Sequence, residues 1–137
     1  MQQSRGFRAL KVWMSLKHHG LSGYAEAITR DIALAEYLAR LVDESTSLQR
    51  LASGLSIVCF RYAPPHLRGN EARLETLNKT LLETLQRNGQ AFLSSTTLEG
   101  TFVLRACLVN PRTTPTDLAD LVTLVQDLGA GLAGDNA

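Results

Sequence analysis

Residues Thr101–Val109 have the sequence TFVLRACLV, in which β-branched, aromatic and leucine residues surround one arginine. This composition is typical of a β-strand. Because successive side chains of a strand point to opposite faces, Arg105 shares one face with Val103 and Cys107, while Leu104 lies on the other. Both faces are apolar, so the stretch predicts a buried strand with a charged side chain inside it.

Two other stretches predict strands. Ala91–Thr97 comes just before, and the short link Leu98–Gly100 is consistent with a β-hairpin. Ser56–Tyr62 is again β-branched and aromatic, and Pro64-Pro65 ends it. The sequence therefore predicts three strands, without defining their order in a sheet.

Apolar residues at helical spacing predict two helices before these strands. The first runs from about Arg5 to His19, and Gly20 is placed to end it. The second begins at Ser22, a suitable N-cap, and continues to Val42. The polar residues 43–47 follow and are expected to form a loop.

Two further helices have clear starts. A leucine-striped helix over residues 70–88 has Asn70 as its cap, and Gly89 is placed to end it. The last helix starts with TPTD at Thr114, in which threonine is the N-cap, proline N1 and aspartate N3. Its apolar stripe ends at Leu128, and the Gly- and Ala-rich residues 129–137 are expected to be a flexible tail.

The order of elements is thus helix, helix, strand, helix, strand, strand, helix. It predicts an α/β (α+β) fold, with a three-stranded, antiparallel-containing sheet that packs helices on one face.

The composition is that of one ordinary globular domain, with 45% hydrophobic and 20% charged residues among 137. A net charge of +1 argues against nucleic acid or an anionic membrane as partner. No apolar run approaches the roughly 20 residues of a membrane span, and Met1–Arg5 do not lead into a secretory signal. We therefore expect a cytoplasmic protein.

Cys59 and Cys107 are expected to be buried free thiols. The sequence does not decide whether they form a disulfide with each other.

Arg105 is the most informative single residue. A guanidinium keeps its charge, and burying it unpaired costs several kcal/mol, so something anionic must meet it. One alternative is structural: a salt bridge within the chain, or a side chain that reaches solvent at a sheet edge. The other is functional: a planar fork that binds a substrate carboxylate or a phosphate. The spacing alone favours the structural alternative.

The residues themselves predict no reaction centre. His18 and His19 are adjacent and point about 100° apart on a helix, so they cannot chelate one metal well, and His66 is expected to be a solvated loop residue. Phosphate-loop, dinucleotide-binding and serine-nucleophile motifs do not occur. None of the three lysines, Lys11, Lys17 and Lys79, has the apolar surroundings of a Schiff-base lysine. We therefore predict no catalytic, cofactor-binding or metal-binding residue in this chain.

Several short stretches, however, occur in one order along nearly the whole chain: Phe7–Trp13, His19-Gly20 with Gly23-Tyr24, Ala35–Leu38, Ile57–Tyr62, Pro64-Pro65, Phe102–Arg105 and Asn110–Thr114. Taken together, they resemble the C-terminal part of the group II pyridoxal-phosphate-dependent amino-acid decarboxylases. That family includes the aromatic-L-amino-acid, histidine and glutamate decarboxylases.

The resemblance implies a fragment of a fold-type I enzyme. Residues 1–20 would be the end of the large domain, 21–128 the small C-terminal domain and 129–137 the tail. The Schiff-base lysine, in a His-Lys dipeptide, and the other residues that hold pyridoxal 5′-phosphate would lie upstream. Lys17-His18 has the reversed order and is not given that role. The chain alone is then expected to be inactive and to bind no cofactor, while the full-length enzyme would be a homodimer that releases CO2 from an L-amino acid.

The resemblance also changes the interpretation of Arg105. It matches the arginine that approaches the substrate carboxylate in the glutamate-decarboxylase branch, which implies a substrate-binding role. One departure is Arg5-Gly6-Phe7-Arg8, where family members often have Arg-Arg-Phe-Arg, so a contact of the second arginine is missing. Phe7–Trp13 and Ile57–Tyr62 look closer to the aromatic branch and favour an aromatic substrate.

Two alternatives stay open. The chain could be a stand-alone small α/β module that binds an anionic metabolite through Arg105. It could also be a truncated paralogue that dimerises with an intact subunit.

Overall fold

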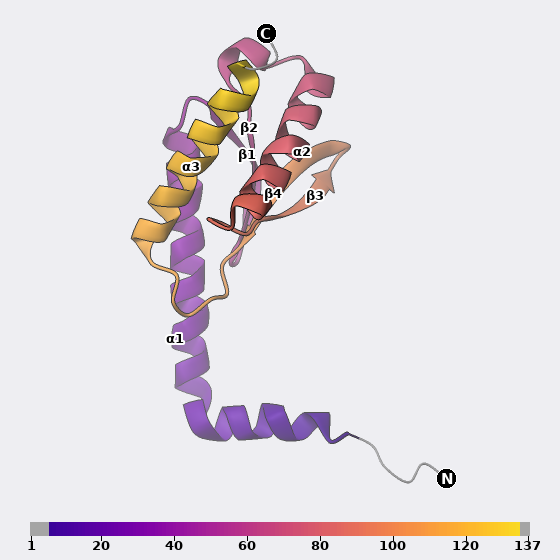
Figure 1. Ribbon diagram of the computed structural model, residues 1–137. Helices are drawn as coiled ribbons and strands as arrows, with labels where there is room; N and C mark the ends of the chain where they lie inside the picture. The colour runs from indigo at the N-terminus through magenta and orange to yellow at the C-terminus, as the bar shows by residue number, and fades with distance from the viewer. Residues whose placement is uncertain (1–5, 135–137) are drawn as a thin grey trace, which may run out of the picture. The chain divides into compact units, whose positions relative to one another are not determined.

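The computed structural model describes residues 6–134, which form two compact units that divide between Arg30 and Asp31 (Figure 1). Helix α1 (Arg8–Glu44) contributes to both units. No helix among residues 6–134 is long and apolar enough to cross a membrane.

The first unit contains the start of α1, and its helix is interrupted at Gly20. Gly20 has φ 70° and ψ 171°, a left-handed conformation that glycine adopts at little cost. The predicted boundary between the first two helices is therefore confirmed. Across the break the hydroxyls of Ser15 and Tyr24 are hydrogen-bonded, and the His19 ring lies edge-to-face with Tyr24 at 6.2 Å. The helix begins at Arg8, and the predicted start at Arg5 lies outside the described residues.

The second unit is a four-stranded antiparallel sheet in the order β1-β2-β4-β3. Its strands are β1 (Leu48–Gly54), β2 (Ile57–Tyr62), β3 (Ser94–Leu98) and β4 (Thr101–Cys107). Its helices are residues 31–44 of α1, α2 (Glu71–Asn88) and α3 (Pro115–Gly134), with a short 3₁₀ helix η1 at Pro65–Leu67. The mixed α/β class is confirmed.

The helices pack on one face of this sheet. The buried core takes alternate strand residues, Val58, Phe60 and Tyr62 of β2 and Leu104 and Ala106 of β4. It combines them with apolar side chains of all three helices: Leu34, Leu38, Val42, Leu74, Leu77, Leu81, Leu85, Leu118, Val122 and Val125. Figure 1 shows α2 and α3 in front of the strands. The opposite face carries Cys59, Val103 and Arg105, and none of these three belongs to the core cluster.

The predicted caps of the last two helices are confirmed. Asn70 Oδ1 accepts a hydrogen bond from the Arg73 amide at 3.1 Å, and Gly89 follows α2 with φ 66°. At α3 the Thr114 amide donates to Asp117 Oδ2 at 2.7 Å while the Asp117 amide donates to Thr114 Oγ1 at 3.3 Å, which is a reciprocal capping box.

The predicted number of strands was wrong. The strand β1, with the sequence LQRLASG, has no β-branched or aromatic residue and therefore carries no strand signal. It becomes a strand because it pairs with β2, whose residues strongly favour a strand, and it forms one edge of the sheet. The register of this pairing shifts between Arg50 and Ala52. The expected strand from Ala91 begins only at Ser94, and the turn at Glu99-Gly100 confirms the β3–β4 hairpin.

The predicted end of the last helix was also wrong. The helix α3 continues past Leu128 to Gly134. Gly129 does not end it, because this buried glycine lies against the ring of Tyr62, where an added Cβ would come within 2.6 Å of ring carbons. Leu132 and Ala133 then pack on the core and hold the last turn in place. Residues 135–137 of the predicted tail lie outside the described residues.

Candidate functional site

The candidate site is on the sheet face opposite the helices and is built around Arg105. This residue is half-buried on β4, with Cys59 of β2 opposite it on one side and Ser94 of β3 on the other. Its Nε donates to Ser94 Oγ at 3.0 Å, and Ser94 Oγ donates to the backbone carbonyl of Arg105 at 3.1 Å. The site is therefore formed by three neighbouring strands.

The terminal nitrogens of Arg105 are not used inside the described chain. Within residues 6–134, neither Nη1 nor Nη2 of Arg105 has a hydrogen-bond or ion-pair partner. The first structural alternative, a salt bridge between Arg105 and a carboxylate of the same chain, is therefore not present among residues 6–134. The fork is left available to an anion from outside.

Cys59 forms an apolar side of this site. Cys59 is 6% exposed, and its burial raises the pKa of the thiol above the ordinary value. The positive charge of Arg105 lowers this pKa, and Cys107 raises it further, but burial is the largest of the three effects. Cys59 therefore stays neutral and is not the counter-ion of Arg105. Both cysteines are free thiols, and Cys59 is buried as predicted. The prediction that Cys107 is buried was wrong, because the last residue of β4 is exposed at the end of the strand.

Arg61 is a second arginine on the same face, and each of its three side-chain nitrogens has a partner. It is 7% exposed, its Nε donates to Gln49 Oε1 at 2.9 Å, and its Nη1 and Nη2 donate to the two carboxylate oxygens of Glu71 at 2.5 and 3.2 Å. This ion pair holds the pKa of Glu71 below its ordinary value. Glu71 thus neutralises the charge of Arg61, whereas no carboxylate among residues 6–134 pairs with Arg105.

Sequence reasoning missed Ser94, Arg61 and Asn78. The register that places Ser94 opposite Arg105, and the pairing of Arg61 with Glu71, have no local sequence signal. Asn78 did have one, because it lies on the apolar stripe of α2, where a polar side chain must find a buried partner. Its amide holds the end of β2: Tyr62 N donates to Asn78 Oδ1 at 2.8 Å, and Asn78 Nδ2 donates to Tyr62 O at 2.9 Å.

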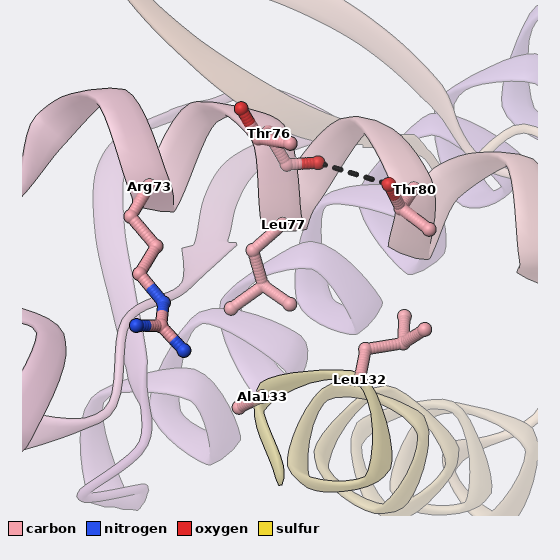
Figure 2. A pocket seen from close by; sticks show the side chains of 6 residues that line it. All are labelled: Arg73, Thr76, Leu77, Thr80, Leu132 and Ala133. Atoms are coloured by element: carbon pink, nitrogen blue, oxygen red, sulfur yellow. Dashed lines mark hydrogen bonds between the residues drawn. The ribbon is translucent and has the colours of Figure 1, made fainter. Parts of the chain in front are cut away.

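The cavity of about 340 Å³ between α2 and α3 is not a reaction centre (Figure 2). Leu77 and Leu132 point into it from the two helices, and Thr80 Oγ1 donates to the backbone oxygen of Thr76 at 3.1 Å. The hydroxyl of Thr80 is therefore committed to its own helix, and no pair of acid and base groups lines the cavity. The cavity includes no residue that the sequence analysis singled out.

Among residues 6–134, no group of three or more His, Cys, Asp or Glu side chains could hold a metal ion. His18 and His19 stack edge-to-face at 4.5 Å, and His66 is exposed in η1.

Comparison with known proteins shows what the chain is similar to. Residues 1–63 match a family model described as the pyridoxal-dependent decarboxylase conserved domain. The chain is 34% identical to an aromatic-L-amino-acid decarboxylase of Bacillus atrophaeus, over 93% of this chain and 27% of that protein. It is 31% identical to tyrosine decarboxylase 3 of Petroselinum crispum, over 96% of this chain and 26% of that protein. The solved structure of Oryza sativa TDC with PLP and tryptamine matches with a TM-score of 0.84 at 25% identity, over 93% of this chain and 28% of that one.

Over nearly its whole length, the chain is similar to pyridoxal-dependent decarboxylases. It spans about a quarter of the length of the curated relatives it matches. The resemblance expected from the ordered sequence stretches is therefore confirmed, and the chain shares its fold with solved structures of such enzymes.

The surroundings of the three lysines among residues 6–134 do not fit a covalent site for pyridoxal phosphate. A Schiff-base lysine requires a desolvated pocket that lowers its pKa. Lys11, Lys17 and Lys79 are all exposed, and Lys79 Nζ is paired with Glu75 at 2.6 Å. Lys17 Nζ lies 5.9 Å from the centre of the Trp13 ring, which leaves it on the surface. The terminal nitrogens of Arg105, which have no partner among residues 6–134, make it the candidate binding group.

Proposed function

We propose that this chain is the C-terminal segment of a pyridoxal-phosphate-dependent L-amino-acid decarboxylase, and that Arg105 contacts the carboxylate of the substrate. The observation that supports this role is the free Nη1 and Nη2 edge of Arg105 on a sheet face that no helix of residues 31–134 covers. In the complete protein, that face would lie against the large domain, which would hold the cofactor. The complete enzyme would be a cytoplasmic homodimer.

An aromatic L-amino acid is the favoured substrate class. The support is the names of the relatives, among them a tryptophan decarboxylase of Oryza sativa that is 34% identical over 110 residues. Those names describe other proteins, and the chain covers only 22% of this one. The substrate class of this protein is therefore part of the proposal.

Arg105 is better suited to orient the carboxylate than to hold it strongly. Catalysis requires interactions that are stronger in the transition state than in the ground state. A strong ion pair on a carboxylate that is about to leave as CO2 would stabilise the ground state and oppose the reaction. A half-buried guanidinium already bonded through Nε can align the carboxylate or help close the site at a smaller cost.

The test is Arg105→Met in the complete decarboxylase. We expect KM for the amino acid to rise or kcat to fall by about 10-fold or more, the range for loss of a charge-assisted hydrogen bond. The matched control is Arg87→Met, because Arg87 is an exposed arginine with only a 3.6 Å contact to Glu83. If both variants keep the parent kinetics, Arg105 does not belong to the site.

The cofactor proposal has its own test. We expect the 137-residue chain mixed with pyridoxal 5′-phosphate to show no internal-aldimine absorbance near the visible edge and no decarboxylase activity. A stable absorbance band that survives gel filtration, and that is lost on replacing one of the three lysines, would overturn this part.

A second candidate is a stand-alone module that binds an anionic metabolite through the same fork. The free Nη1 and Nη2 edge favours this candidate too, because it would suit any carboxylate. Calorimetry of the chain with amino acids and keto acids separates the two, since only the stand-alone module predicts tight binding by this chain alone. A truncated paralogue that pairs with an intact subunit would instead regain activity when mixed with that subunit.

A further inference from the structure

We propose that Ser94 is a positioning residue that fixes the Arg105 guanidinium so that its two terminal nitrogens, side by side, meet the substrate carboxylate. This inference rests on the proposed function, because it assigns to β3 the orientation of the group that Arg105 would use. It adds a residue from a strand whose sequence gave no sign of a site.

The hydrogen bonds of Ser94 define which way its hydroxyl points. A serine hydroxyl has one proton. That proton is donated to the backbone oxygen of Arg105, with an O···O distance of 3.1 Å. Towards Arg105 Nε, 3.0 Å away, the same oxygen can therefore only accept. The backbone of Arg105 thus orients the hydroxyl that in turn orients the Arg105 side chain.

This contact leaves one bidentate edge of the guanidinium. An arginine has five N–H donors and can bind a carboxylate either through Nε and one terminal nitrogen or through both terminal nitrogens. Because Nε is occupied by Ser94, the first edge is blocked. Nη1 and Nη2, which have no partner among residues 6–134, form the remaining edge.

Arg61 shows that this chain already binds a carboxylate in the same way. Its Nε donates to Gln49, the residue directly opposite it on the neighbouring strand, and its Nη1 and Nη2 bind both oxygens of Glu71. Arg105 repeats the first half of this arrangement, with Ser94 directly opposite it and accepting from Nε. The missing half is a carboxylate, which the substrate would supply.

The surroundings of Arg105 favour a fixed orientation. Val103 is 0% exposed and Cys59 is 6% exposed, so the base of the side chain lies on a dry apolar surface. Hydrogen bonds in such surroundings are stronger than in water. An arginine that is already held loses less conformational freedom when it binds its ligand, so affinity increases without a new contact to the ligand.

The experiment compares two inhibitors of the complete decarboxylase, 3-phenylpropanoate and 3-phenylpropanamide, which have nearly the same shape but differ in charge. We expect Ser94→Ala to weaken the binding of 3-phenylpropanoate about 3- to 10-fold, the range for one ordinary hydrogen bond. The affinity for 3-phenylpropanamide should not change. Ser94→Thr keeps the hydroxyl and should restore the preference for the carboxylate. Ser95→Ala is the matched control, because Ser95 is the next residue of β3 and faces the opposite side of the sheet.

A double-mutant cycle separates positioning from a merely structural effect. If Ser94 acts through Arg105, Ser94→Ala should have no further effect on the carboxylate in an Arg105→Met background. An equal loss for both inhibitors, or an additive effect in the double variant, would overturn the positioning role. If Ser94→Ala keeps the normal preference for the carboxylate inhibitor and Arg105→Met loses it, the positioning role of Ser94 is wrong. The same result would support the proposed function of Arg105. An Arg105→Met variant that keeps the preference would reject both.

Discussion

The side chain of Asn78 on α2 replaces a strand at the end of β2, because it forms two hydrogen bonds with the backbone of Tyr62. The pairing of β2 with β4 stops at Phe60 and Leu104, so the amide and carbonyl of Tyr62 have no partner on β4. Asn78 Oδ1 accepts from the amide at 2.8 Å, and Nδ2 donates to the carbonyl at 2.9 Å. Asn78 is 0% exposed and also bonds to Leu74 O at 2.8 Å.

Asn78→Leu should therefore destabilise the protein although the new residue has a similar size and suits the leucine stripe. The substitution leaves the buried amide and carbonyl of Tyr62 without partners, and each such group costs about 1–3 kcal/mol. We expect a loss of about 2–5 kcal/mol in the free energy of unfolding, measured by urea denaturation. Thr76→Leu, on the exposed side of the same helix, is the control and should change stability little. Equal stability of the Asn78 and Thr76 variants would contradict this role.

Gly129→Ala should be destabilising, which is opposite to the usual effect of this substitution in a helix. Alanine is normally favoured over glycine inside a helix by up to about 1 kcal/mol. At Gly129, however, the new methyl group would come within 2.6 Å of the Tyr62 ring, so α3 or the ring must shift. We expect a loss of about 1–3 kcal/mol, the range for overpacking, and a lower Tm.

Gly131 provides the matched control for that prediction. It lies on the exposed side of the same helix, and an added Cβ would meet nothing within 4 Å. Gly131→Ala should raise the Tm because only the helix propensity changes. A rise in Tm for both variants would show that the contact between Gly129 and Tyr62 is not tight.

Acid should destabilise the second unit through Glu71, Asp43 and Asp117. Arg61 lowers the pKa of Glu71, Arg50 lowers that of Asp43, and the backbone and side chain of Thr114 lower that of Asp117. A carboxyl whose pKa is lower in the folded state stabilises the fold above its unfolded pKa, and the stabilisation is lost as pH falls through the folded pKa. Because the ordinary values are 4.5 for Glu71 and 3.8 for the two aspartates, the loss should begin near pH 4.5 and continue below it.

The measurement is the midpoint of urea unfolding between pH 7 and pH 3. Glu71→Gln should lower the midpoint at pH 7, because Arg61 is buried and would lose its counter-ion, and should reduce the further drop in acid. Glu83→Gln, which removes a carboxylate 3.6 Å from Arg87 on the exposed side of α2, should behave like the parent protein. The same acid dependence in parent and Glu71→Gln would rule out Glu71 as a contributor.

The two cysteines of the 137-residue chain should differ in their reaction with a thiol reagent. Cys107 is exposed, whereas Cys59 is buried and its thiol pKa is raised, so less of it is the reactive thiolate. We expect one fast-reacting thiol in the folded chain and two after unfolding. Cys107→Ser should abolish the fast reaction, and fast labelling that persists in this variant would show that Cys59 is accessible.

Residues that signal their structure locally could be predicted, and residues defined by pairing could not. Gly20, Asn70, Gly89 and Thr114 each carry their own conformational or capping signal, and the structure confirms all four. The edge strand β1 has no such signal, because its pairing with β2 determines its conformation. At Gly129 the sequence predicts a helix end, whereas the close approach of this glycine to Tyr62 is a tertiary contact that sequence spacing does not reveal.

The candidate site follows the same rule. Arg105 could be identified from the sequence alone, because a charged residue inside an apolar strand needs a binding partner. Ser94 could not, because its importance depends on the register between β3 and β4. The difference between Arg61 and Arg105 also depends on tertiary structure, since only the folded chain places Glu71 beside Arg61.

The early end of the β2–β4 pairing makes the sheet divide into two branches. Beyond Phe60 and Leu104, β4 continues with β3 alone to the turn at Glu99-Gly100. A ribbon of two strands is more free to twist than a wide sheet. Arg105 lies just before this point, where β4 is paired with a strand on each side. This part of the sheet is stiffer than the two-stranded ribbon. Bending of the ribbon should therefore leave the Arg105 side chain in place.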